Sequence, residues 1–318
     1  MKKITLLLSF IACVVMANAQ LVSENFDFTL GDQLKTHGWV GTGAAPSTTN
    51  PILITIPTIT YAGYPGSGVG NEITLMNTGE DLNKSFTAIT SGSIYYSALI
   101  NVTAAQATGD YFFHIGDVPT GTTFFGRIYI KQKIGTSNLA FGVLKTSGGT
   151  TVQNTSYSDS IYSLNTTYLL VAKVEVATGN SSLIINPAIS ATEPTSGWLV
   201  STVGTTTLPA AGFTTVNLRQ GSASLAASLK VDGVKVATSW AALFTSTSVN
   251  PVSTDILNVS TAGKKLTITN SPSNTVEIFN TVGSKVQSLQ LLNGSADLNL
   301  AKGLYIVRAG KATAKIML

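Results

Sequence analysis

Three groups of acidic residues have the side chains that acid–base chemistry requires. They are Glu24 with Asp27, Glu80 with Asp81, and Asp110 with Asp117. Hydrolysis of a glycosidic bond needs two carboxyl groups about 5 to 9.5 Å apart. Adjacent side chains point to opposite faces of a strand, so Glu80 and Asp81 are interpreted as turn and solvent-facing residues. The acids alone predict no catalytic pair.

Histidine and serine chemistry is equally sparse. The two histidines, His37 and His114, form no H-x-H, H-x3-H or H-E-x-x-H pattern, which argues against a transition-metal site. Neither has an evident orienting partner, so a structural role is favoured for both over a catalytic one. There is no G-x-S-x-G elbow, and the glycine-rich segment at 66–70 lacks the lysine of a phosphate loop. We therefore predict no catalytic residue.

Aromatic residues in loop-rich stretches suggest binding instead. Sugars stack on aromatic faces, and this makes Trp39, Tyr61, Tyr64 and Trp198 the candidate ligand-binding residues. The alternative for each is packing at the rim of a core.

No cofactor is predicted from the sequence, although calcium is possible. Calcium needs several oxygen ligands, and Asp27, Asp110 and Asp232 are available to supply them. Asp232-Gly233 is more simply explained as a hairpin turn. The metal ligands, if any, are therefore left unknown.

The first 19 residues predict a signal peptide. Lys2 and Lys3 precede an apolar run that ends at an A-x-A site before Gln20. The alternative, an uncleaved membrane anchor, is disfavoured because the run is shorter than the roughly 20 residues of a spanning helix. The only cysteine, Cys13, lies inside this segment, so the mature chain has no disulfide. No later segment is predicted to span a membrane.

Composition indicates a large β domain followed by a smaller one. The 318 residues exceed the roughly 250 to 300 that one core accommodates, and only 11% are charged. Basic residues are scattered, which excludes a nucleic-acid-binding face. Residues 21–250 hold 10 basic and 12 acidic side chains, whereas residues 251–318 hold 7 and 3. The positive charge of the mature chain therefore belongs to the C-terminal region.

The elements that must position any site are strands. Apolar residues alternate with a period of two, and Gly-rich turns separate the runs at intervals near ten residues. This pattern predicts an all-β fold, an antiparallel jelly-roll sandwich at 20–244, a linker at 245–250 and a small C-terminal β-sandwich at 251–318. The strands are expected at 93–102, 110–116, 124–133, 138–145, 167–177, 182–186, 215–220 and 229–236.

The C-terminal region resembles the type A sorting domain of the type IX (Por) secretion system of Bacteroidetes. The resemblance rests on NPVS at 250–253, VEIFN at 276–280, and the residues Gly283, Gly303, Tyr305, Ile306, Val307, Arg308 and Lys315. It implies the secretion machinery as a partner, and export to the cell surface or the medium. The alternative is an ordinary β module that contributes to binding.

The preceding domain resembles, more loosely, a concanavalin A-like jelly roll of the laminin G-like type. The matching pieces are ENFD at 24–27, Gly38-Trp39, YLLVAK at 168–173 and VDGVKVATSW at 231–240. The resemblance implies that the opening strand and the last strand of this domain pair in the middle of a sheet. The hydrolases of this fold family carry an E-x-D-x-E strand, which is missing here. The sequence therefore predicts a secreted or surface-attached, non-catalytic protein that binds glycans or adheres. A glycoside hydrolase with an unrecognised carboxylate pair is the alternative.

Overall fold

The structure is a computed structural model, and it describes most of the chain after residue 19. The described ranges are 20–43, 46–119, 123–146, 155–204, 207–244, 258–262, 265–269, 275–291, 295–309 and 312–318. The predicted signal peptide at 1–19, the linker at 245–250 and the NPVS motif lie outside them. The chain divides into two compact units, Met1–Ser246 and Thr247–Leu318.

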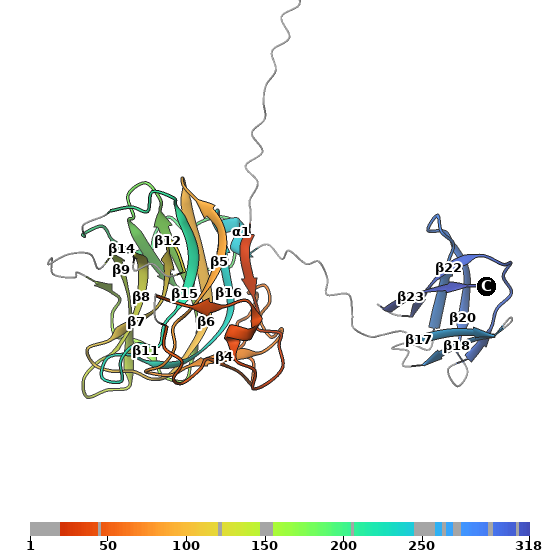
Figure 1. Cartoon of the computed structure of the whole chain (residues 1–318), viewed down its shortest axis with the longest axis horizontal. Helices are drawn as coiled ribbons and strands as arrows, with labels where there is room; N and C mark the ends of the chain where they lie inside the picture. Colours follow the sequence, from red (N-terminus) through yellow and green to blue (C-terminus); the bar gives the residue numbers. More distant parts are fainter. Residues whose placement is uncertain are drawn as a thin grey trace, which may run out of the picture. The chain divides into compact units, whose positions relative to one another are not determined.

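The first unit contains two eight-stranded sheets, each of them antiparallel (Figure 1). In the first sheet, the first strand of the unit, β1 (Gln20–Glu24), pairs with its last strand, β16 (Ser228–Ala237). Strand β16 also pairs with β6 (Ser93–Ala104), so the two ends of the unit meet inside this sheet. In spatial order it consists of β14 (Leu199–Ser201), β13 (Ser181–Ile185), β12 (Thr167–Glu175), β6 (Ser93–Ala104), β16 (Ser228–Ala237), β4 (Glu72–Leu75) and β3 (Leu53–Thr55), with β1 (Gln20–Glu24) beside β16.

The second sheet contains the five consecutive strands β7 to β11 together with β2, β5 and β15. In spatial order it consists of β10 (Ser156–Tyr157), β9 (Asn138–Thr146), β8 (Phe124–Gln132), β7 (Asp110–Gly116), β15 (Phe213–Leu218), β5 (Leu82–Ile89) and β2 (Val40–Gly41), with β11 (Tyr162–Ser163) beside β9.

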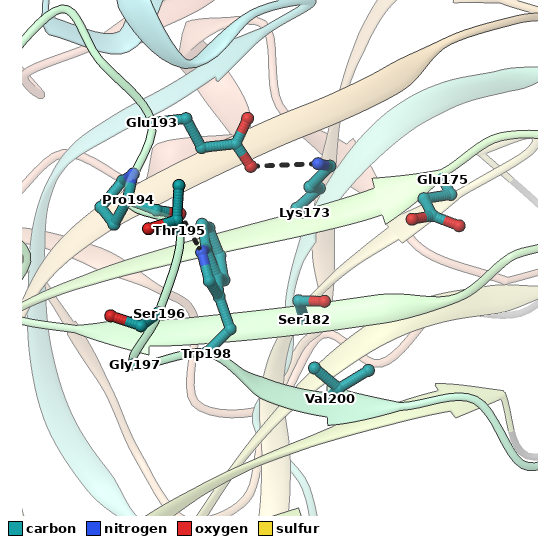
Figure 2. A pocket seen from close by; sticks show the side chains of 10 residues that line it. All are labelled: Lys173, Glu175, Ser182, Glu193, Pro194, Thr195, Ser196, Gly197, Trp198 and Val200. Carbon is teal, nitrogen blue, oxygen red and sulfur yellow. Dashed lines mark hydrogen bonds and ion pairs between the residues drawn. The ribbon is translucent and has the colours of Figure 1, made fainter.

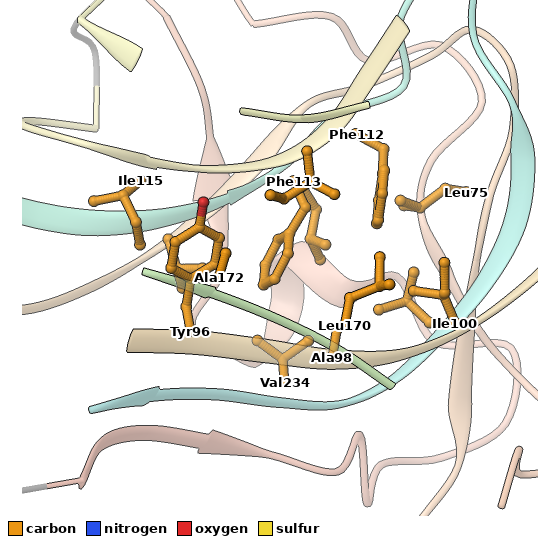
Figure 3. Close-up of a cluster of buried hydrophobic side chains, with 14 of the residues drawn as sticks. Leu75, Tyr96, Ala98, Ile100, Phe112, Phe113, Ile115, Leu170, Ala172 and Val234 are labelled. Atoms are coloured by element: carbon orange, nitrogen blue, oxygen red, sulfur yellow. The ribbon is translucent and has the colours of Figure 1, made fainter. Parts of the chain in front are cut away.

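The main core fills the space between these sheets. Figure 3 shows Tyr96, Ala98 and Ile100 of β6 meeting Phe113 and Ile115 of β7. The rings of Tyr96 and Phe113 are 5.1 Å apart and nearly perpendicular. Alternation explains the arrangement, since successive side chains of a strand point to opposite faces. The alternation of apolar and polar residues in the sequence therefore determines which face of each strand enters the core.

The other face of the first sheet is also buried, which the sequence pattern does not predict. A second cluster covers it, in which Tyr64 and the short helix α1 (Trp240–Phe244) pack on Tyr95 and Leu99 of β6. Tyr95 and Leu99 are the residues of β6 that alternate with those of the main core. Neither α1 nor the 3-10 helix η1 (Leu34–His37) is predicted from periodicity, because each is shorter than two helical turns.

The second unit contains a three-stranded and a four-stranded sheet around its own small core. The first comprises β17 (Asn258–Ala262), β18 (Lys265–Thr269) and β21 (Ser295–Asp297). The second comprises β20 (Lys285–Gln290), β19 (Thr275–Phe279), β22 (Leu304–Ala309) and β23 (Ala312–Met317). The buried cluster is made by Val276, Ile278, Leu291, Leu298, Val307, Ala309 and Ile316.

The predicted sorting-signal residues occupy different environments in the second unit. Gly283 adopts a φ of +82° in the turn after β19, and Gly303 exchanges two backbone hydrogen bonds with Leu318. Val307 is fully buried, Tyr305 is half-buried, and Ile306, Arg308 and Lys315 are exposed. Arg308 pairs with the carboxylate of Glu277 on the neighbouring strand. Their side chains can therefore be explained by the fold of this unit.

The predicted fold class is confirmed: the chain is all-β, with an antiparallel jelly-roll sandwich followed by a small β-sandwich. The expected pairing of the opening strand with the last strand of the large domain is also confirmed. Within the described ranges, no helix is both long and apolar enough to cross a membrane.

Candidate functional site

A pocket of about 400 Å³ lies on the outer side of the first sheet, at the end formed by β12, β13 and β14 (Figure 2). The segment 193–198 closes one side of it. Hydroxyl, carboxylate, ammonium and indole groups all reach the cavity. The lining residues are Lys173, Glu175, Ser182, Glu193, Pro194, Thr195, Ser196, Gly197, Trp198 and Val200.

The indole of Trp198 is held in a fixed orientation. Its Nε1 donates a hydrogen bond of 2.9 Å to the carbonyl oxygen of Pro194. Its ring packs edge-on against Trp240, with centroids 5.8 Å apart. Trp198 is half-buried, and Figure 2 shows its ring standing between Thr195 and Ser182. The pocket therefore has a rigid aromatic wall that needs little ordering when a ligand binds.

An ion pair and a phenol order the polar side of the pocket. Lys173 Nζ lies 3.0 Å from a carboxylate oxygen of Glu193, and the Tyr95 hydroxyl donates a 2.6 Å hydrogen bond to the other. Burial, followed by the hydrogen bond to Glu193, raises the pKa of Tyr95 to about 12. Burial lowers the pKa of Lys173, but Glu193 and Tyr95 outweigh it, so that pKa lies above its usual value. Tyr95 and Lys173 therefore each hold one protonation state near neutral pH.

This arrangement matches the chemistry of a sugar ring. A pyranose has apolar C–H faces that stack on an indole, and hydroxyl groups at its edge that exchange hydrogen bonds with carboxylates and hydroxyls. The pocket provides both kinds of contact within one small volume. Small-molecule sites commonly combine apolar walls with a few polar groups in this way.

The structure brings one of the four predicted aromatic residues into this pocket, Trp198. The prediction that Trp39 and Tyr64 offer faces to a ligand is wrong, because they are only 1% and 3% exposed. Trp39 donates from Nε1 to Glu24, and the Tyr64 hydroxyl donates to the Gly233 carbonyl oxygen at 2.7 Å. Tyr61 is half-buried against the second cluster and does not line the pocket. The loop-rich stretches that contain Trp39 and Tyr64 pack against the sheets. Their position outside the predicted strands therefore did not mean that these side chains are exposed.

Three residues of the site were not singled out from the sequence: Tyr95, Lys173 and Glu193. Tyr95 and Lys173 are direct partners in the register of β6 and β12, on the face that does not enter the main core. Alternation within the two predicted strands could have placed both on that face. No sequence signal links them to Glu193, which comes from a loop.

Two of the candidate acidic residues, Asp81 and Asp110, meet beside Arg219 on the second sheet. Arg219 binds Asp110 at 2.7 Å and lies 3.7 Å from Asp81, so one guanidinium serves two carboxylates. Burial raises the pKa of Asp81 to about 6, although hydrogen bonding from Gln220 and the charge of Arg219 oppose this. Asp81 thus changes protonation near neutral pH, as a group that donates or accepts a proton must.

Three of the other candidate acids, Glu24, Glu80 and Asp117, have structural partners. Glu24 binds Lys84 at 2.6 Å, and Glu80 accepts a hydrogen bond from the Ile52 backbone. Asp117 accepts one from the next backbone amide, that of Val118. Asp27 is exposed.

The proposed calcium ligands are not brought together. Asp110 is at the start of β7 in the second sheet, whereas Asp232 is buried in β16 of the first sheet. Among the described residues, no group of three or more His, Cys, Asp or Glu side chains is placed to hold a metal ion. His37 lies 3.0 Å from Asp32 and stacks on Phe28, as a structural histidine does.

No family model matches the chain, and neither does any curated protein. Several solved structures are similar to the chain at low identity. The CBM2 module of the evolved Dit of Lactobacillus casei BL23 phage J-1 is 10% identical, with a TM-score of 0.39, over 69% of this chain and 95% of that chain.

Two further structures give similar values. Domain 4 of AbnA, a GH43 extracellular arabinanase from Geobacillus stearothermophilus in complex with arabinotriose, is 14% identical over 70% of this chain and 93% of that one, with a TM-score of 0.40. A legume lectin-like domain from Entamoeba histolytica is 10% identical over 68% and 95%, with a TM-score of 0.38. Likeness at this level assigns neither a ligand nor an activity to the chain.

Proposed function

We propose that the first unit is a non-catalytic glycan-binding module and that the pocket beside Trp198 is its binding site. The observation that carries the proposal is the pairing of a fixed indole wall with the Lys173–Glu193 ion pair in one pocket. A sugar residue stacks on Trp198, and its hydroxyls bind Glu193, Ser182 and Thr195. Adhesion to a surface glycan is the cellular role that such binding supports.

A glycan array probed with the mature chain, residues 20–318, tests this proposal. Trp198→Ala should weaken binding of any neutral glycan hit at least about tenfold, because the stacking surface is lost. Ile161→Ala is the matched control, since Ile161 is 70% exposed and lies outside the pocket. Equal affinities of wild type and Trp198→Ala, with both variants folded, would exclude the pocket as the site.

The delivery route belongs to the same proposal. The signal peptide pattern and the sorting-domain resemblance of the second unit support export by type IX secretion, and they make that machinery a partner of the chain. The exported protein is then secreted or attached to the outer-membrane surface.

The alternative, a glycoside hydrolase, is supported by one observation: Asp81 and Asp110 converge on Arg219, and the pKa of Asp81 is raised to about 6. Release of reducing sugar from polysaccharides that the protein binds is the test. Activity that Asp81→Asn abolishes would replace the binding proposal with a hydrolase. Binding without release supports the module.

A further inference from the structure

A row of tyrosines crosses the outer face of the second sheet, opposite to the face that enters the main core. Tyr111 of β7 is the register partner of Tyr129 of β8, with ring centroids 5.6 Å apart. Tyr129 is the partner of Gly142 in β9, and Gly142 is the partner of Tyr157 in β10. The rings of Tyr129 and Tyr157 are 6.3 Å apart. The row thus runs perpendicular to four strands.

Gly142 makes this row continuous. A Cβ atom at Gly142 would lie 2.6 Å from Cδ1 of Tyr157, so the missing side chain is the space that Tyr157 occupies. Tyr111 and Tyr157 are half-buried at the two ends of the row, and Tyr129 is 8% exposed between them. Burial raises the pKa of each of the three phenols, so all of them remain hydrogen-bond donors at neutral pH.

Cationic side chains stand over both ends of the row. The guanidinium groups of Arg127 and Arg219 lie 4.6 and 4.2 Å from the centroid of Tyr111. The ammonium of Lys131 lies 3.8 Å from the centroid of Tyr157. Cations placed over aromatic faces are held by the ring quadrupole.

The row carries a net positive charge. Its two acids, Asp81 and Asp110, both pair with Arg219, while Lys131 makes no ion pair with any residue in the described part of the chain. Three cations therefore face two acids, and the raised pKa of Asp81 reduces its share of negative charge near neutral pH. The row as a whole favours an anion.

A buried histidine with no hydrogen-bond partner lies in the same cluster. His114 is 1% exposed, and neither of its ring nitrogens has a partner in the structure. Its ring lies 5.4 Å from that of Tyr111 and 4.4 Å from that of Phe124. Burial, followed by the charges of Arg127 and Arg219, lowers its pKa, so the ring is neutral. Buried polar groups are normally paired, so His114 is an unpartnered buried polar group next to Tyr111.

We propose that this tyrosine row is a second binding site, for an oligosaccharide whose sugar residues bear carboxylates. Sugar rings lie along Tyr111 and Tyr157, and the carboxylates bind the exposed parts of Arg219 and Lys131, where guanidinium and ammonium groups give charge-assisted hydrogen bonds. The site lies on the opposite sheet from the Trp198 pocket and does not depend on it.

Isothermal titration of the mature chain with a hexamer of galacturonate tests the proposal. The matched ligand is the same hexamer as its methyl ester, which keeps the sugar rings and removes the charge. The acid should bind at least about tenfold more tightly than the ester, and its affinity should fall with added salt. Oligoalginate and sialyllactose, run alongside, distinguish the sources of the carboxylate.

Lys131→Met is the decisive variant, because it removes the ammonium and keeps an apolar stem over Tyr157. It should weaken acid binding about tenfold, whereas Lys133→Met, a change at an exposed lysine beyond the end of β8, should leave binding unchanged. Trp198→Ala should also leave acid binding unchanged, which separates this site from the proposed pocket. The resonances of the His114 ring should shift when the acid binds.

Three outcomes would overturn the proposal. They are equal affinity for acid and ester, equal losses in Lys131→Met and Lys133→Met, and failure of all three acidic glycans to bind. Unfolding of the variants is followed by circular dichroism, so that a loss of affinity is compared only among folded proteins.

Discussion

At the scale of single residues, environment decides the role of a side chain more than its type does. Two aromatic residues that look like ligand platforms, Trp39 and Tyr64, are buried and hydrogen-bonded. Tyr95, which the sequence pattern places in an ordinary strand, donates a hydrogen bond to Glu193 and so fixes the position of a pocket-lining carboxylate. Environment also sets the properties of Asp232. This residue is fully buried in β16, and one of its carboxylate oxygens has no partner in the structure.

Asp232→Asn should remove part of the pH dependence of stability. Burial raises the pKa of Asp232 from 3.8 to about 8, so between these values the folded state binds a proton that the unfolded state has lost. The free energy of unfolding therefore falls as pH rises through this window. The variant should be more stable by on the order of 2 kcal/mol near pH 8 and equal to wild type near pH 4.

Urea unfolding between pH 4 and pH 8 measures the difference. Asp27→Asn is the control, because Asp27 is exposed. Parallel pH profiles for wild type and Asp232→Asn would contradict the prediction.

Tyr64→Phe should destabilise the first unit by about 1 to 2 kcal/mol. The hydroxyl of Tyr64 donates to the Gly233 carbonyl oxygen at 2.7 Å and lies 2.8 Å from the Ser97 hydroxyl. Both partners are in the first sheet, so the loss leaves buried polar groups unsatisfied. The shift in urea midpoint at constant slope gives the value, and an unchanged midpoint would show that the two hydrogen bonds contribute nothing net.

At the scale of elements, the strands use both faces. β6 sends Tyr96, Ala98 and Ile100 into the main core, and it sends Tyr95 and Leu99 into the second cluster. The second sheet differs, because its outer face carries the tyrosine row and its cations instead of a covering cluster. The register of β7, β8, β9 and β10 aligns that row, and Gly142 is the position at which the alignment is most easily broken.

Gly142→Ala should displace the ring of Tyr157 and weaken binding of the galacturonate hexamer severalfold. The added methyl would meet Tyr157 Cδ1 at 2.6 Å, so the ring must shift and its contact with Lys131 must change. Ile134→Ala is the control, since Ile134 is 85% exposed in the turn after β8. Equal hexamer affinity in Gly142→Ala and Ile134→Ala would contradict the prediction.

At the scale of the whole molecule, the two units have separate cores and opposite charge balances. The main core and the second cluster contain only residues of Met1–Ser246, and the third cluster contains only residues of Thr247–Leu318. Each unit therefore has the buried surface of an independent folding unit. A separate function for each, binding in the first and export in the second, is compatible with this division.

Deletion of the chain from Pro251 onward should leave the first unit folded and stop its export. Residues 20–250 retain both clusters of the first unit, so their thermal transition should be preserved by circular dichroism. Fractionation of cells should find the truncated protein in the periplasm. Truncated protein at wild-type levels on the cell surface or in the medium would refute the export role.

Much of the fold could be predicted because strand alternation is a local property. The strands expected at 93–102, 110–116 and 138–145 correspond to β6, β7 and β9, within two residues at nearly every end. The pairing of the two ends of the first unit followed from ENFD and VDGVKV. Of the candidate site, only Trp198 was predicted. The other residues, Tyr95, Lys173 and Glu193, come from β6, β12 and a loop 20 residues after Lys173, and only the tertiary structure brings them together.

The fold class, the absence of cysteine after residue 19 and the uneven distribution of charge can be read from the amino-acid sequence, because they depend on composition and on a period of two. Tertiary structure alone decided which aromatic rings are buried, which acids share Arg219 and which tyrosines align across four strands. Those properties depend on strand register and on loops that fold back over the sheets, and contacts between residues far apart in the chain leave no local pattern to read.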